Sequence, residues 1–145
     1  MARRDAYHDV VKSALEKDGW VITHDPLRLV AGGVRAYIDL GAEQTVGAQK
    51  EGEKIAVEIK SFVVDSDISE LERAIGQYIL YAVILTQQEP DRKLYLAVPE
   101  TAYYGIFSEQ VVDLLVKNQK IRLIIYDVLE ERITQWIDEK NIKQS

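Results

Sequence analysis

The sequence predicts an α/β fold of the α+β kind, in which a mixed β-sheet is flanked by helices. Two alternating segments in the first half of the chain suit an antiparallel hairpin, and later strands alternate with helical segments. Hairpins join antiparallel strands and helical crossovers join parallel ones, so the two patterns together predict a mixed sheet. The 145 residues contain no repeat and no Pro/Gly/Ser-rich linker, which indicates a single domain over residues 1–145.

The chain is expected to open with a helix and a short strand. Residues 5–17 place apolar side chains at helical spacing, and Gly19 ends the helix. Residues 20–23 are predicted to form a strand. Residues 24–26 form the turn after it, because Pro26 disfavours continued strand pairing.

A hairpin is expected next. Residues 34–40 alternate between apolar and polar side chains, and so do residues 54–60. In the second segment Glu58 and Lys60 share one face of the strand, because successive side chains point to opposite faces. The turn residues at 50–53 allow the two segments to pair as antiparallel neighbours.

Helices and strands alternate in the second half of the chain. Asp67 and Glu70 resemble a capping box, which opens a helix running to about Leu85. Further elements are expected as a strand at 93–98, a helix at 108–116, and strands at 121–127 and 132–137. This order of elements predicts helical crossover connections in the second half of the chain, in addition to the hairpin in the first half.

The composition is that of a soluble globular protein, with 47% hydrophobic and 29% charged residues. The absence of cysteine excludes thiol catalysis, disulfides and cysteine zinc sites. The N-terminus lacks the apolar segment of a signal peptide, and the longest apolar stretch, residues 78–85, is too short to span a bilayer. We therefore expect a cytoplasmic protein with no membrane partner.

The net charge of −6 argues against tight autonomous DNA binding, because phosphate-binding proteins usually carry a basic field. A local basic cleft is still compatible with this charge. Six cationic residues fall in the same half of the chain as the candidate site: Lys12, Lys17, Arg28, Arg35, Lys50 and Lys54.

Two carboxylates are predicted to meet where the hairpin strands pair. If the strands are neighbours, Asp39 and Glu58 lie close together, and their repulsion is unfavourable unless a proton or a cation sits between them. Mg²⁺ prefers oxygen ligands, commonly one or two carboxylates with waters and substrate phosphate, and the backbone carbonyl of Ile59 offers a further ligand. The sequence therefore predicts a Mg²⁺ site, with Mn²⁺ as an alternative ion.

Lys60 adds a cation to the same strand face as Glu58. Hydrolysis of a phosphodiester needs an activated water and stabilisation of the charge that develops on the phosphate. A lysine at this position can orient the water and offset that charge. A lone Glu-x-Lys is usually a solvated pair on a strand edge, so the argument depends on the neighbouring Asp39.

These residues resemble the PD-(D/E)XK phosphodiesterases, particularly the RecB-like and Holliday-junction-resolvase-like members, over residues 5–85. The pattern consists of Ile38-Asp39, eighteen intervening residues, Val57-Glu58-Ile59-Lys60-Ser61, and then Gln77-x-x-x-Tyr81 on a helix. The resemblance implies a restriction-endonuclease-like core in which Asp39 and Glu58 bind the metal. It also implies that Lys60 assists catalysis and that Gln77 supports the site or contacts the substrate.

The chain departs from this pattern at two points. Ile38 stands where the pattern has proline, and the first helix lacks an obvious match for the glutamate that the family usually supplies there. The choice in that helix lies among His8, Lys12 and Glu16. Helical geometry places His8 at the edge of the apolar stripe and Glu16 nearly opposite Tyr7, which favours His8.

A closer resemblance covers nearly the whole chain. The matching segments are 2–8, 17–26, 39–43, 56–62 and 94–99, including Asp18-Gly19-Trp20, Asp39-Leu40-Gly41-Ala42-Glu43 and Ala56-Val57-Glu58-Ile59-Lys60-Ser61-Phe62. They resemble the XisH family of fdxN element excision controlling factors, found chiefly in cyanobacteria. This resemblance implies a role in programmed DNA excision, with DNA, an XisI-family companion and a site-specific recombinase as candidate partners. The resemblance is also compatible with a homo-oligomer.

Several other residues have simpler interpretations. Gln77 and Tyr81 are compatible with one exposed turn and one core aromatic, and Glu43 with a solvated strand end instead of a further acidic ligand. The turn at 24–26 is expected to be structural. Trp136 is expected in the core or at an interface.

Two function classes follow. The first is a metal-dependent endonuclease that acts on DNA during element excision, with Asp39, Glu58, Lys60, Gln77 and His8 at its site. The second is a catalytically inactive protein of the same fold that controls a recombinase through protein–protein binding, for which the acidic net charge is the clue. A defence nuclease is a third alternative that no residue distinguishes.

Overall fold

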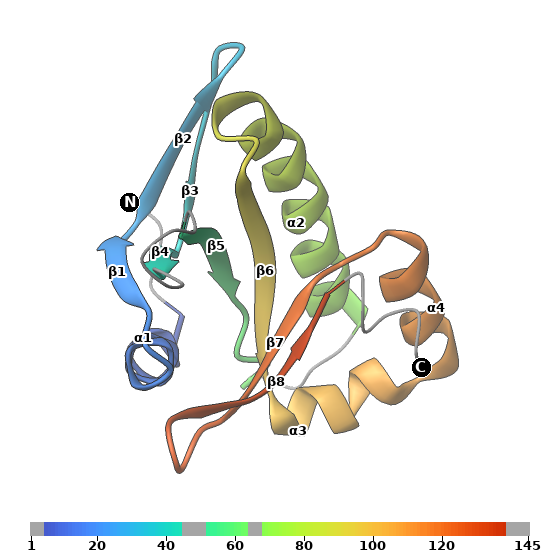
Figure 1. Cartoon of the computed structure of the whole chain (residues 1–145). Helices are drawn as coiled ribbons and strands as arrows, with labels where there is room; N and C mark the ends of the chain where they lie inside the picture. The colour runs from blue at the N-terminus through green and yellow to red at the C-terminus, as the bar shows by residue number, and fades with distance from the viewer. Residues whose placement is uncertain (1–4, 45–51, 64–67, 139–145) are drawn as a thin grey trace.

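The computed structural model describes residues 5–44, 52–63 and 68–138 (Figure 1). The helices are α1 (His8–Lys17), α2 (Ile68–Gln88), α3 (Glu100–Tyr104) and α4 (Gln110–Asn118), with a 3₁₀ helix η1 (Ile106–Ser108). The strands are β1 (Val21–His24), β2 (Leu27–Ala31), β3 (Val34–Ile38), β4 (Leu40–Gln44), β5 (Glu53–Ile59), β6 (Arg92–Pro99), β7 (Leu123–Asp127) and β8 (Arg132–Ile137). No helix in these described ranges is long and apolar enough to cross a membrane.

Six strands form one mixed sheet in the order β1-β4-β5-β6-β7-β8. The pairs β1–β4, β4–β5 and β7–β8 are antiparallel, whereas β5–β6 and β6–β7 are parallel. The parallel pairs arise where a helical crossover joins the strands, as the sequence predicts. The mixed sheet flanked by helices is therefore confirmed. The expected antiparallel neighbour of β5 is β4, which covers residues 40–44 and not the predicted 34–40.

Both faces of the central strands are buried. In β5, Ile55, Val57 and Ile59 pack in one core with Val11 and Leu15 of α1. Ala56, on the opposite face, belongs to the second core, which contains α2, α3 and α4. Helices thus cover both sides of the sheet, which explains why its central strands read as nearly continuous apolar runs. Glu58 has the parity of Ala56, so its side chain leaves β5 on the α2 face.

The predicted single strand at 34–40 is wrong, because the chain bends at Asp39 and divides it into β3 and β4. β3 pairs with β2 in a separate two-stranded sheet, whereas β4 joins the main sheet. Leu29 and Ile38 of the small sheet pack in the core on the α2 side. Asp39 therefore occupies a corner of the chain, beside the main sheet.

The β2–β3 hairpin projects from this corner along α2 (Figure 1). Its tip is Gly32-Gly33, with φ values of +53° and +82°, the left-handed conformations that a two-residue hairpin loop requires. Gln88 at the end of α2 fixes the hairpin: its Oε1 accepts from the Val30 N–H at 2.7 Å, and its Nε2 donates to the Arg28 carbonyl at 2.9 Å.

The structure also contains elements that the sequence did not predict. One is β2, although the Gly-Gly pair between two alternating runs is a hairpin signal. Another is α3, which begins directly after Pro99. The predicted capping residue Asp67 and part of the predicted turn, residues 50 and 51, lie outside the described residues.

Candidate active site

Asp39 and Glu58 lie side by side at the end of β5. The β4–β5 register pairs Leu40 with Val57, so the next position brings Asp39 opposite Glu58. The Asp39 backbone N–H points to Glu58 Oε1 at 3.4 Å, and the Ile59 N–H donates to Asp39 Oδ2 at 2.8 Å. The strand pairing thus brings the two carboxylates together, as the alternation predicted.

Burial makes this carboxylate pair electrostatically unusual. Glu58 is only 6% exposed. Loss of solvent, followed by the negative charge of Asp39, raises the pKa of Glu58 to about 8, and Lys60 only partly opposes this shift. Burial also raises the pKa of Asp39, although the Ile59 N–H favours its charged form. Without a bound cation, the pair therefore keeps a proton near neutral pH.

Lys60 lies at the border of the pair. Its Nζ is 4.0 Å from Glu58 Oε2, at the outer limit of an ion pair, and its side chain is largely buried. The Lys60 N–H donates to the Ala97 carbonyl at 3.0 Å, which fixes the backbone at this point against β6. The ammonium group is thus next to the carboxylates but does not form a tight salt bridge with Glu58.

Helix α2 closes the site from the side that Glu58 faces. Burial raises the pKa of Tyr81, and the charges of Glu58 and Asp39 raise it further, so the Tyr81 hydroxyl lies within electrostatic reach of both carboxylates. Gln77 is one helical turn before Tyr81 and shares its side of the helix. Gln77 Oε1 is buried and has no hydrogen-bond partner in the described part of the chain.

His8 of α1 is buried and contacts the turn after β1. Its Nε2 is 2.7 Å from Asp25 Oδ1, while Lys12 Nζ donates to Asp25 Oδ2 at 3.1 Å. Burial alone would raise the pKa of Asp25, but Lys12 and His8 outweigh it and lower that pKa. His8 also favours the charged form of Asp39, so His8 lies on the side of α1 that faces Asp39. Glu16 is exposed.

Asp5 is a neighbour of the site that the sequence analysis did not single out. Its Oδ2 accepts from the Ser61 N–H at 2.9 Å, and its Oδ1 accepts from the Tyr7 N–H at 2.9 Å. Its charge contributes to raising the pKa of Asp39. Asp5 precedes α1 and pairs with a residue far along the chain, so no periodic pattern could have revealed it.

The predicted alternatives have other partners. Glu43 lies 3.8 Å from Arg92, which also pairs with Glu89 at 3.1 Å, so Glu43 is engaged away from Asp39. Of the predicted basic residues, Lys12 contacts Asp25, Lys17 donates to the Glu130 carbonyl and Lys54 lies 4.0 Å from Asp91. Arg28 and Arg35 are exposed on the β2–β3 hairpin, and Lys50 lies outside the described residues.

The donor set suits a hard divalent cation. Two adjacent carboxylates supply oxygen ligands. The Ile59 carbonyl lies on the same edge of β5 as the Ile59 N–H, which donates to Asp39. Within the described ranges, no group of three or more His, Asp or Glu side chains is placed to hold a metal. Asp39, Glu58 and the Ile59 carbonyl are oxygen donors of the kind that Mg²⁺ or Mn²⁺ takes together with waters or phosphate.

The sequence profile of the XisH family, described as XisH protein, matches residues 1–134. The chain belongs to the XisH family. An XisH family protein from Nostoc punctiforme PCC 73102 is 47% identical, with a TM-score of 0.84 over 92% of this chain and 100% of that one. An fdxN element excision controlling factor protein from Anabaena variabilis is 45% identical, with a TM-score of 0.84 over 93% and 100%. No curated protein matches this XisH chain.

Proposed function

We propose that this XisH-family protein is a divalent-metal-dependent endonuclease with a PD-(D/E)XK active site, acting in the excision of a DNA element. The buried Asp39–Glu58 pair beside Lys60 carries the proposal, because burying two adjacent carboxylates is unfavourable unless a cation or a shared proton joins them. The excision role rests on the relative from Anabaena variabilis, which is described as an fdxN element excision controlling factor.

The proposed reaction is hydrolysis of a phosphodiester. A water oxygen forms a bond to phosphorus as the bond from phosphorus to one sugar oxygen breaks, and that oxygen leaves with a proton. A bound Mg²⁺ or Mn²⁺ supplies Lewis-acid activation of water and offsets phosphate charge. Asp39, Glu58 and the Ile59 carbonyl are the residues that would hold it.

The surrounding side chains have separate roles in this proposal. Lys60 orients the attacking water and balances the charge that develops on the phosphate. Gln77 turns its amide, whose oxygen lacks a partner in the described residues, toward a water or the DNA. His8 holds Asp25 and α1 in place beside Asp39, which makes it a positioning residue.

The β2–β3 hairpin is the proposed DNA contact. Residues 27–38 contain two arginines and no acidic residue, in a chain whose net charge is −6. Arg28 pairs across the hairpin with Tyr37, and Arg35 pairs with Val30, so the four exposed side chains share one face. Arginines contact phosphates and an exposed tyrosine can stack on a base. The hairpin runs directly into Asp39.

Cleavage assays test the proposal. Purified protein is incubated with branched, single-stranded and double-stranded DNA in Mg²⁺, Mn²⁺ or EDTA. We expect cleavage only with metal, and a loss of at least about 100-fold in Glu58→Ala and Lys60→Ala. Glu72→Ala and Lys93→Ala, at exposed positions, serve as matched controls and should cleave normally. Equal cleavage by the wild type and both site variants would refute the assignment.

A non-catalytic controlling factor is the second candidate, and the acidic net charge favours it. Such a protein would act by binding a recombinase or an XisI-family companion, and its function would not need the carboxylates. Excision in cells separates the two candidates. If Asp39→Ala and Glu58→Ala proteins accumulate normally and still support excision, the controlling-factor role replaces the nuclease.

A further inference from the structure

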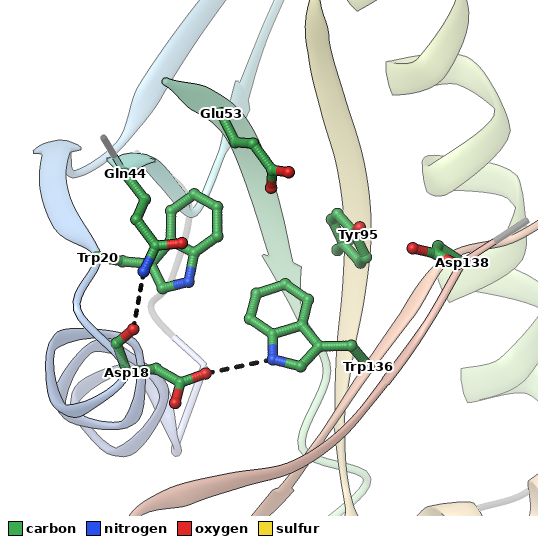
Figure 2. Close-up of a pocket in the computed structure, with 7 residues that line it drawn as sticks. All are labelled: Asp18, Trp20, Gln44, Glu53, Tyr95, Trp136 and Asp138. Carbon is green, nitrogen blue, oxygen red and sulfur yellow. Dashed lines mark hydrogen bonds between the residues drawn. The ribbon is translucent and has the colours of Figure 1, made fainter. Parts of the chain in front are cut away.

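A pocket lies on the face of the sheet opposite to Glu58, near the start of β5 (Figure 2). Its volume is about 300 Å³, and its lining includes three aromatic residues, Trp20, Tyr95 and Trp136, and three carboxylates, Asp18, Glu53 and Asp138. Glu53 precedes Glu58 by five residues, roughly 16 Å along an extended strand, and has the opposite parity. The pocket is therefore separate from the candidate active site.

The aromatic wall of this pocket is held in a fixed arrangement. The rings of Trp20 and Trp136 are 5.7 Å apart at 31°, and the Tyr95 ring meets Trp136 at 5.1 Å, nearly perpendicular. Trp136 Nε1 donates to Asp18 Oδ2 at 3.3 Å, and Gln44 Nε2 donates to the Asp18 carbonyl at 2.9 Å (Figure 2). These bonds join β8, β4 and the end of α1, so the pocket is preformed.

Among the described residues that line the pocket, every charged side chain is acidic: Asp18, Glu53 and Asp138. Figure 2 shows the Glu53 carboxylate pointing toward the aromatic residues, with Trp20 on one side, Tyr95 on the other and Trp136 below. Aromatic faces attract cations, and carboxylates strengthen that attraction. The same charges repel phosphate, so DNA is a poor occupant of this pocket.

We propose that this pocket binds a guanidinium group, as carried by an arginine side chain. A guanidinium is planar and weakly hydrated, so it can stack on an indole while its N–H groups form paired hydrogen bonds to a carboxylate. Glu53 and Asp18 supply the carboxylate oxygens, and the half-buried Trp136 supplies the aromatic face, with the buried Trp20 packed behind it. The arginine belongs to a partner protein or to a small guanidinium compound, and the two sources can be distinguished.

The protein carries its own probe for this test. Trp20 and Trp136 are the only two tryptophans in the sequence, and both line the pocket. Intrinsic fluorescence is titrated with acetyl-Gly-Arg-Gly-amide, with the same peptide containing citrulline, which is neutral and of similar shape, and with agmatine. We expect a saturable change with the arginine peptide and at least about tenfold weaker binding of the citrulline peptide.

Glu53→Gln should weaken arginine-peptide binding by about fivefold or more, whereas the control Glu72→Gln on α2 should leave it unchanged. Peptide binding tighter than agmatine binding assigns the site to a partner protein, and the reverse order assigns it to a small compound. An unsaturable response, or equal binding of arginine and citrulline peptides, would overturn the proposal. Lys60→Ala should bind normally, so this test is independent of the nuclease assignment.

Discussion

The backbone N–H of Ile59 donates a 2.8 Å hydrogen bond to Asp39 Oδ2, joining the corner after β3 to the end of β5. This bond holds the Asp39 carboxylate against the strand that carries Glu58 and Lys60. The fold thus positions the Asp39 and Glu58 carboxylates side by side. This is the preorganised arrangement that the proposed metal site would require.

The pH dependence of stability follows from Glu58. Its pKa is 4.5 as an ordinary glutamate and about 8 in the fold, so the folded protein keeps a proton that the unfolded chain loses between those values. The free energy of unfolding therefore falls as pH rises from about 4.5 to about 8. A pKa shift corresponds to about 1.4 kcal/mol per pKa unit. In metal-free protein at about pH 9, Glu58→Gln should therefore stabilise the fold, by about 1–3 kcal/mol, which is less than the full shift would give.

Thermal denaturation in EDTA checks this prediction. The variant should melt several degrees above the wild type at about pH 9, and the difference should shrink toward about pH 4.5. Glu72→Gln, on the exposed side of α2, should show no such trend. A Glu58→Gln protein less stable than the wild type at high pH would show that burial of the charged Glu58 carboxylate does not destabilise the fold.

Metal binding should release a proton. Because the raised pKa of Glu58 is about 8, the cation competes with a proton at neutral pH. Mg²⁺ affinity should rise by up to about tenfold per pH unit below that value and level off above it. Isothermal titration calorimetry in buffers of different ionisation enthalpy counts the released protons. Glu58→Gln should show little Mg²⁺ binding and no proton release, and a pH-independent wild-type affinity would contradict the shift.

The strand pattern predicted much of the site because period-two alternation is a local signal. It placed Glu58 and Lys60 on one face, and a paired neighbour was enough to bring Asp39 beside them. The bounds of β8, Arg132–Ile137, were also predicted as observed. The alternation of apolar and polar residues continues from residue 34 to residue 40, however, so it could not reveal that the chain bends at Asp39.

The parts that the sequence did not reveal depend on long-range contacts. Asp5 meets Ser61 across the fold, and His8 meets Asp25 between α1 and the turn after β1. Neither contact has a spacing signature, because the partners belong to different elements. The β2–β3 hairpin had a local signal in Gly32-Gly33, although no strand was predicted between the turn at 24–26 and Val34.

Substitution of Gln77 should affect the cleavage rate more than the stability of the fold. Its buried Oε1 has no hydrogen-bond partner among the described residues, so removing it should change the free energy of unfolding by less than about 1 kcal/mol. If Gln77 binds a water or the DNA, Gln77→Ala should nevertheless lower the cleavage rate by about tenfold. Gln87→Ala, at an exposed position of the same helix, is the control. A loss of stability without loss of cleavage would assign Gln77 to packing.

The hairpin arginines should set the salt dependence of DNA binding. Each phosphate contact contributes about −0.9 to the slope of log affinity against log salt. Arg28→Gln combined with Arg35→Gln should therefore weaken duplex binding and make that slope shallower by about 2. Lys93→Gln combined with Arg132→Gln removes the same charge from other exposed positions. If both double variants reduce binding equally, overall charge and not the hairpin is responsible.

The most direct test of the proposed metal site is a crystal of the protein soaked in Mn²⁺, examined by anomalous scattering. We predict a peak at about 2.1–2.2 Å from carboxylate oxygens of Asp39 and Glu58 and near the Ile59 carbonyl, with Lys60 Nζ beside it but unbound. The Glu58→Gln crystal should lose the peak. Absence of a peak in the wild type, with Lys60 closed into a salt bridge with both carboxylates, would contradict the metal site.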